Sequence, residues 1–438
     1  MSPAEIGAAM FAGCLGLVAL RVPVAAAMLV SAMVGYAGLV GVWPMLNALK
    51  TLTFSRFSSY TLSVIPLFLL MGEFASRGGL NRTLFAAARA WLGHRRGGLA
   101  LAAIGGCAAF GAICGSSVAT AATMSQVAAP EMRRAGYAGG LTTATLAAGG
   151  TLGILIPPSV ILVIYAVYTE QSIGALFIAA VVPGLLAVLC YMAVVMLHAR
   201  IVPASAPPAP RLPWRERLGP TLAVWPAAIV FALIVAGIYR GWFSPTEGAA
   251  IGALSVGALA VLLGGMRLGG LRGAILGTAE TTGMMFVILV GAEFFSAALA
   301  LSRMPAAFAD WVAGLDAPPV LVLSLVIAAY FLLGTVMESL AMILLTLPVF
   351  VPLMLRLDFG MSPAATLVWF GILVLTSVEV GMISPPFGLN LFVISGMVRD
   401  VPITETWRAV IGFCAADVLR VGLLVAVPGL SLWLPGLS

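Results

Sequence analysis

The chain has 438 residues, of which 62% are hydrophobic and only 9% are charged, and its mean hydropathy is +1.12. Soluble domains carry about 25% charged residues, so this composition excludes a soluble protein and predicts a polytopic membrane protein. The net charge of +6 comes from Arg and Lys in short loops between apolar runs, which is the pattern of a membrane topology signal and not of nucleic-acid binding.

Apolar segments long enough to cross a bilayer recur along the whole chain; a spanning helix needs about 20 residues. The first follows an N-terminus without the basic region or cleavage site of a signal peptide, so we expect it to be retained as a short membrane helix. The segments lie at 5–20, 23–43, 60–77, 139–168, 173–199, 219–239, 247–265, 274–300, 362–398 and 407–433.

Two further apolar stretches, 98–132 and 320–355, carry small or polar residues near their middle. The first contains "ICGSSVATAATMSQ" and the second "GTVMESLAMILLT". Each is long enough for two half-depth helices, so we predict two re-entrant hairpins that enter and leave on the same side. Irregular backbone at membrane depth is tolerated only where protein or a wet cavity surrounds it.

The basic residues predict an orientation. With the N-terminus in the periplasm and each hairpin returning to its starting side, sixteen Arg residues fall on the cytoplasmic side and five Arg or Lys residues outside. This asymmetry is the one that the positive-inside rule describes.

Two passages recur in the second half of the chain. "MGEFAS" at 71–76 resembles "GAEFFS" at 291–296, and a Pro-Pro pair inside an apolar segment occurs at 157–158 and again at 385–386. Five crossings in each half would turn the second copy upside down, which is the inverted-repeat architecture of secondary transporters. We therefore predict an all-α membrane protein with a first repeat at 1–200, a cytoplasmic linker at 201–218 and a second repeat at 219–438.

The Pro-Pro pairs break helices inside the membrane, because proline removes a backbone donor and clashes with the preceding turn. Freed carbonyl oxygens and half-helix C-termini suit a hard cation such as Na⁺, and half-helix N-termini suit an anion. Pairing the first hairpin tip with 149–159 and the second with 376–390 would create two related cation sites. Hydroxyl and amide groups near the breaks come from Thr151, Ser159, Thr376, Ser377, Ser384 and Asn390.

Other interpretations of these features remain open. The Pro-Pro kinks and the "SSVATAAT" run could serve helix packing alone. Glu73 and Glu293 could be structural groups or ligands, whereas Glu379, beside the second break, is a better candidate for shaping a site. We expect Asp417 and Arg420 to form a structural pair.

The sequence offers few candidates for the energy source of transport and for the positive charge that an anionic substrate would need. We find no Walker A loop or soluble domain for ATP in the sequence, so an ion gradient or another subunit must drive transport. We expect no Lys or Arg to lie within the core, so helix N-termini, hydroxyls and bound cations would have to meet the charge of an anionic substrate. An intramembrane enzyme is disfavoured, because His94 and His198 lie at segment ends.

Four passages resemble the large membrane subunit of tripartite ATP-independent periplasmic (TRAP) transporters. The resemblance implies a Na⁺-driven importer of organic acids in the bacterial inner membrane, working by an elevator mechanism. It also implies two partners, a separate small membrane subunit and a periplasmic solute-binding protein. The passages are "GSSVATAATM" (115–124), "GGTLGILIPPSVILVIYAVYTEQSIGALFIA" (149–179), "ESLAMILLTLPVF" (338–350) and "VGMISPPFGLNLFV" (380–393).

The same resemblance implies a set of site residues. Many members have Asp in the second tip, where this chain has Glu338. Na⁺ ligands would be Ser116, Ser117, Thr151, Gly153, Gly334, Glu338, Thr376, Gly381 and Ser384, and the substrate would contact Gly115, Pro157, Pro158, Ser159, Pro385, Pro386 and Asn390.

The alternative function is a stand-alone ion-coupled carboxylate symporter that works without a binding protein.

Overall fold

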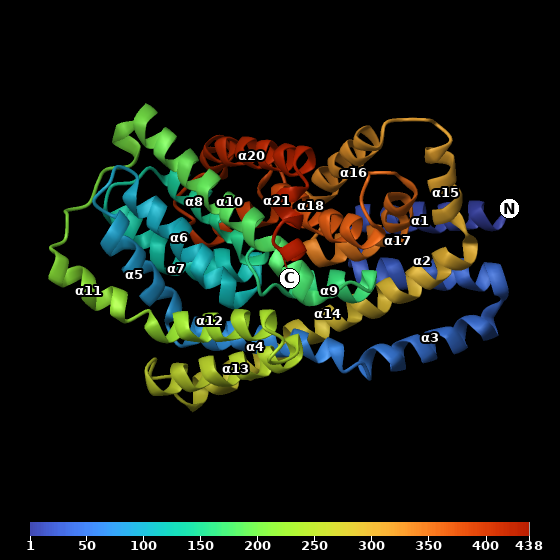
Figure 1. Ribbon diagram of the computed structural model, residues 1–438, viewed down its shortest axis with the longest axis horizontal. Helices are drawn as coiled ribbons and strands as arrows, with labels where there is room; N and C mark the ends of the chain where they lie inside the picture. The colour runs from blue at the N-terminus through green and yellow to red at the C-terminus, as the bar shows by residue number, and fades with distance from the viewer. Residues whose placement is uncertain (438) are drawn as a thin grey trace.

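The computed structural model describes residues 1–437, and within them the protein consists of helices and connecting loops without a β-strand (Figure 1). Six of the helices are each long and apolar enough to cross a membrane, and three bent pairs of helices pass the same test when each pair is taken together. The prediction of an all-α polytopic membrane protein is confirmed.

The first half of the chain contains two helix interruptions of interest. A short loop separates α6 from α7, and a second separates α8 from α9 with a bend of 42°. The helices are α1 (Pro3–Ala19), α2 (Val24–Val40), α3 (Val42–Phe57), η1 (Thr61–Ser63), α4 (Val64–Arg77), α5 (Leu80–Leu92), α6 (Gly98–Cys114), α7 (Ser117–Arg134), α8 (Gly139–Leu155), α9 (Val160–Thr169) and α10 (Ile173–Ile201).

The second half repeats these interruptions between α16 and α17 and between α18 and α19. A linker with one short helix of its own precedes it. The helices are η2 (Pro203–Ser205), α11 (Trp214–Leu222), α12 (Trp225–Tyr239), α13 (Pro245–Leu262), α14 (Leu268–Ser302), α15 (Met304–Ala313), α16 (Pro319–Gly334), α17 (Ser339–Arg356), α18 (Pro363–Ile383), α19 (Leu389–Met397), α20 (Ile403–Ala426), α21 (Gly429–Leu432) and η3 (Pro435–Leu437).

Four helices were not predicted from the sequence. α3 carries Lys50 and Arg56, and α5, α11 and α15 are short with polar residues among the apolar ones, so none forms a continuous apolar run. α5 buries Leu84, Phe85 and Ala90 on one face and exposes polar residues on the other. An amphipathic helix of this kind is recognised by its 3.6-residue period and not by its mean hydropathy.

The helices pack in two groups. In the first, which we call the scaffold, α1 and α2 pack along α14, and α4 packs against α13 and α14, with α12 beside α13. In the second, the hairpin core, α6 and α7 pack on α8, and α16 and α17 pack on α18; α19 packs on α7 and α8, and α20 on α8. Figure 1 shows α3, α4, α12 and α13 along one edge of the molecule and α20 along the opposite edge.

The two halves of the chain are interleaved inside the hairpin core. α19 of the second half packs against α7 and α8 of the first, and α8 packs against α18. Both interrupted helices therefore lie in one body, together with both hairpins.

The two acidic residues of the repeated Glu-Phe passages are held in ion pairs. Glu73 binds Arg77 one turn further along α4, with 2.8 Å between Oε2 and Nε. Glu293 of α14 binds Arg56 of α3, with 2.7 Å between Oε2 and Nη2. Of the two interpretations that the sequence left open, these contacts favour the structural one.

Candidate functional site

The first break lies between α8 and α9, at Ile156–Ser159. The backbone of Ile156 is extended, the peptide bond between Pro157 and Pro158 is cis, and Ser159 forms the N-cap of α9. The Ser159 hydroxyl accepts a hydrogen bond from the backbone N–H of Leu162 at 3.4 Å and is completely buried. The N-terminus of the half-helix α9 thus lies buried in the protein, and the Ser159 hydroxyl caps it.

The first hairpin tip lies directly against this break. A Cβ placed on Gly153 would lie 2.6 Å from the carbonyl oxygen of Ser116 and 2.5 Å from Thr120 Oγ1, so only glycine allows this approach. Gly115 has φ +64°, and a Cβ there would lie 3.2 Å from the carbonyl oxygen of Pro158. The predicted pairing of the tip with 149–159 is therefore present in the structure.

The second tip meets α18 in the same way. A Cβ on Gly381 would lie 2.5 Å from both Cα and the carbonyl carbon of Gly334, and a Cβ on Gly334 would lie 3.1 Å from the carbonyl oxygen of Val378. Glu338 is the N-cap of α17, and its side chain makes no capping hydrogen bond. Backbone groups of tip and helix are thus in contact at both breaks.

Ser117 connects the first tip to the second half of the chain. Its hydroxyl donates to Glu379 Oε2 at 3.0 Å and accepts from Asn390 Nδ2 at 2.9 Å. Asn390 Nδ2 also donates to the carbonyl oxygen of Ala147 at 3.2 Å. All three side chains are buried, so residues from α7, α18 and α19 form one polar cluster in the centre of the hairpin core.

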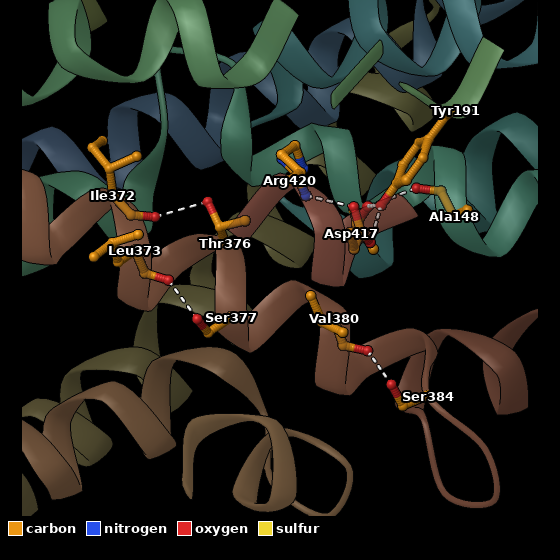
Figure 2. Close-up of polar contacts among 11 residues, drawn as sticks. Ala148, Tyr191, Ile372, Leu373, Thr376, Ser377, Val380, Ser384, Asp417 and Arg420 are labelled. Carbon is orange, nitrogen blue, oxygen red and sulfur yellow. Dashed lines mark hydrogen bonds and ion pairs between the residues drawn. The ribbon is translucent and has the colours of Figure 1, made fainter. Parts of the chain in front are cut away.

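The hydroxyls of α18 point back to their own helix. Figure 2 shows that Thr376 donates to the carbonyl oxygen of Ile372, Ser377 to Leu373 and Ser384 to Val380. Their protons are therefore used locally, as is common for Ser and Thr in membrane helices, while lone pairs of their oxygens stay available.

Thr151 belongs to a different network. Its hydroxyl donates to the carbonyl oxygen of Ala148 at 2.6 Å and lies 2.9 Å from the Tyr191 hydroxyl. Tyr191 in turn donates to Asp417 Oδ2 at 2.7 Å, and Arg420 donates to Asp417 Oδ1 at 2.7 Å (Figure 2). The expected pair of Asp417 and Arg420 is present, but it is fully buried, so the expectation that no arginine lies in the core is wrong.

The remaining proline positions differ between the two breaks. Pro157 and Pro158 are buried, whereas Pro385 is half-buried and Pro386 and Phe387 are exposed; the bond between Pro385 and Pro386 is also cis. A cavity of about 390 Å³ lies beside Pro157 and Pro158, lined by apolar side chains such as Phe177, Ile234 and Ile238. Tyr239 is the one lining residue with a polar side chain, and none of the residues of the polar cluster lines this cavity.

The comparisons with known proteins decide the family. Residues 11–430 match the family described as "Tripartite ATP-independent periplasmic transporter, DctM component". The chain belongs to this family. It is therefore a large permease subunit of a TRAP transporter, a multi-pass membrane protein and not an enzyme, as the sequence predicted.

Curated relatives agree over most of the chain. The C4-dicarboxylate TRAP transporter large permease protein DctM of Pseudomonas aeruginosa is 38% identical over 87% of this chain and 88% of its own. The ectoine TRAP transporter large permease protein TeaC of Halomonas elongata is 28% identical over 98% and 99%. The isethionate TRAP transporter permease protein DctMQ of Oleidesulfovibrio alaskensis is 32% identical, and the match covers 88% of this chain but only 60% of that longer protein.

Among solved structures, the YdaH transporter of Alcanivorax borkumensis superposes with a TM-score of 0.62, covering 87% of this chain and 88% of that one. The sequence identity is 18%, so the likeness concerns the fold alone. It agrees with the all-α transporter architecture described above.

Two residues near the site were not predicted from the sequence. Thr120 lies one helical turn after Ser116, and its hydroxyl faces Gly153. The helical repeat could therefore have indicated Thr120 as a residue of the first hairpin tip. Tyr191 lies in the middle of an apolar helix, and nothing in the sequence distinguishes it from an ordinary core aromatic residue. Its hydrogen bond with Asp417 joins residues 226 positions apart.

Proposed function

We propose that this large permease subunit imports an organic acid together with Na⁺, and that a periplasmic solute-binding protein delivers the substrate. A separate small membrane subunit would complete the transporter. The observation that carries the proposal is the pair of close backbone approaches at the helix breaks, Gly153 to Ser116 and Gly381 to Gly334.

Each approach supplies the oxygen ligands that Na⁺ prefers. At the first break the carbonyl oxygens of Ser116 and Pro158 lie near Gly153 and Gly115. At the second, the carbonyl oxygen of Val378 lies near Gly334. Unwound carbonyls beside half-helix ends are the usual Na⁺ ligands in secondary transporters. Ser117, Thr151, Glu338, Thr376 and Ser384 remain proposed side-chain ligands.

The substrate would lie between the tips and the breaks. Four half-helices begin there, at Ser116, Ser159, Glu338 and Gly388, and their N-termini carry partial positive charge. Ser159 and Asn390 are the proposed polar contacts. Since Arg420 is already neutralised by Asp417, bound Na⁺ would supply the balancing charge for a carboxylate.

The packing of the molecule supports an elevator mechanism. Both hairpins and both broken helices lie in the hairpin core, and the scaffold touches this core mainly through α4 against α6 and α14 against α17. Sliding of the core along the scaffold would carry the site across the inner membrane. In this proposal the N-terminus is periplasmic.

A reconstituted system tests the coupling ion. Proteoliposomes containing this chain and its small subunit would receive the binding protein loaded with a labelled organic acid. Replacement of external Na⁺ by K⁺ or choline at constant ionic strength should abolish uptake. Uptake that persists without Na⁺ contradicts the proposed coupling.

The runner-up is a stand-alone ion-coupled carboxylate symporter, because every proposed ligand lies within this one chain. Uptake of free substrate by the purified chain, without binding protein or small subunit, would support it. The longer isethionate relative, of which this chain matches 60%, favours the multi-component system, because its name combines two permease components in one chain.

A further inference from the structure

Glu379 has one carboxylate oxygen without a hydrogen-bond partner, although the hydroxyl of Ser339 in the second tip, which donates to Met382 Sδ, lies near this carboxylate. Glu379 Oε2 accepts from Ser117, whereas Oε1 is buried and has no hydrogen-bond partner. The whole residue is inaccessible to solvent in the interior of α18. Within residues 1–437 no Lys, Arg or His forms an ion pair with it; Arg420, which also lies in the core, is paired with Asp417.

Asn390 supplies a second oxygen of the same kind. Its Nδ2 donates to Ser117 Oγ and to the carbonyl oxygen of Ala147, which fixes the orientation of the amide. Its Oδ1 is buried and has no partner. Glu379 and Asn390 both bond to the same Ser117 hydroxyl, Glu379 through Oε2 and Asn390 through Nδ2, so the two side chains that carry the unpartnered oxygens meet at one group.

A single bound cation can satisfy buried acceptors without donors and also balance a buried negative charge; a proton on the carboxylate is the competing solution. An unpaired carboxylate inside a protein is strongly disfavoured, and so is an acceptor without a partner. An anion or a hydrogen-bond acceptor would worsen both defects. A small monovalent cation with a preference for oxygen ligands corrects both of them.

We propose that Glu379, Asn390 and Ser117 form a third Na⁺ site beside the two sites made by backbone carbonyls at the helix breaks, and this assignment replaces the roles given above to Ser117 as a ligand at a break and to Asn390 as a substrate contact. The identity of the ion rests on the proposed Na⁺ coupling. The ligands come from α18, α19 and α7, so an ion here joins the first hairpin tip to the broken helix of the second half. Occupation of the site therefore stabilises the contact of that tip with α18 and α19.

The number of bound ions tests the site directly. Equilibrium binding of radioactive ²²Na⁺ would be measured on the purified full-length chain in nanodiscs, for the wild type and for Glu379→Gln. Glutamine keeps the size of the side chain and an acceptor for Ser117 but removes the charge. We expect saturation at one Na⁺ ion fewer per chain in Glu379→Gln.

The matched control is Glu280→Gln, which neutralises an exposed carboxylate on α14 and should bind as many ions as the wild type. If Glu379→Gln binds the same number of ions as a Na⁺-binding wild type, the third site is overturned and the two backbone sites remain. If the wild type binds no Na⁺, the third site and the proposed Na⁺ coupling both fail.

Thermal unfolding separates loss of the site from loss of the fold. In Na⁺-free choline buffer, Glu379→Gln should have a higher midpoint than the wild type, because it lacks the uncompensated charge. Its midpoint should then rise less with added Na⁺. A midpoint below that of the wild type in Na⁺-free buffer overturns the proposal. So does a difference that varies with pH and not with Na⁺, since a proton would then neutralise the carboxylate.

Discussion

At the scale of single residues, Arg420 is the largest side chain that the described part of the protein buries completely. One of its terminal nitrogens donates to Asp417, while Nε and Nη1 have no partner. Asp417 is further held by Tyr191. One carboxylate, that of Asp417, thus balances the charge of the guanidinium, so loss of this carboxylate should destabilise the core.

Asp417→Ala should destabilise the protein by about 3–5 kcal/mol, because it leaves a buried arginine without its counter-ion. Chemical denaturation of the purified chain in detergent measures the effect. Asp310→Ala is the control, since Asp310 and Arg356 form a mainly exposed pair, and its loss should cost about 1 kcal/mol or less. Equal effects of the two substitutions would contradict the role assigned to the buried pair.

Gly381→Ala should displace the second hairpin tip. The new methyl group would lie 2.5 Å from backbone atoms of Gly334, which cannot rotate away as a side chain could. Overpacking of this kind costs about 1–3 kcal/mol, and we expect a lower thermal midpoint together with loss of uptake. Gly283→Ala on α14, where no atom lies within 4 Å of the new Cβ, should retain both properties.

At the scale of elements, the linker helix α11 is attached to α5 by a stack of side chains. Arg217 is buried, with its guanidinium carbon 5.7 Å from the ring centre of Trp91 and 5.4 Å from that of Trp214. Trp91 donates to Thr221 at 2.8 Å. These contacts hold the linker at α11, whereas most of residues 206–213, which precede α11, remain accessible.

Arg217→Ala should loosen α11 from α5, because it removes both cation–π contacts and the hydrogen bond from Nε to the carbonyl oxygen of Leu212. We expect limited proteolysis within 206–213 to become several-fold faster, as for a loss of about 1–2 kcal/mol of local stability. Arg215→Ala, at an exposed position of the same helix, should leave the cleavage rate unchanged.

The sequence predicted elements that a local pattern marks, and it missed α3, whose charged residues hide it, and the contacts between distant residues. The hairpins α6–α7 and α16–α17 and the breaks at 156–159 and 384–388 lie where Gly, Ser and Pro interrupt apolar runs. α3 was missed because Lys50 and Arg56 lower its hydropathy. The contact of Ser117 with Glu379 spans 262 residues, so no local pattern encodes it.

At the scale of the whole molecule, the scaffold and the hairpin core meet partly through small polar contacts. Ser76 of α4 lies 3.4 Å from Thr123 of α7, between the two hydroxyl oxygens. Tyr168 of α9 lies 2.8 Å from Ser296 of α14, between the two hydroxyl oxygens. Such half-buried contacts contribute little each, which suits an interface that slides.

The proposed sliding predicts that a cross-link between the two bodies stops transport. Oxidation of the double variant Ser76→Cys/Thr123→Cys should abolish Na⁺-driven uptake in proteoliposomes, and a reductant should restore it. The control double variant Thr143→Cys/Thr406→Cys joins two helices of the hairpin core whose hydroxyl oxygens lie 2.7 Å apart. Its oxidation should leave uptake intact; uptake that survives oxidation of the first pair contradicts the sliding.

The hydrogen bond between Ser117 and Asn390 has a consequence for how the protein is made. The ribosome must add a further 273 residues after Ser117 before Asn390 exists. Throughout that interval the newly inserted first hairpin has a polar tip inside lipid without its final partners. We expect a nascent chain that is stopped before α19 to keep this tip open to water or to an insertion factor, and to be degraded faster than one that includes it.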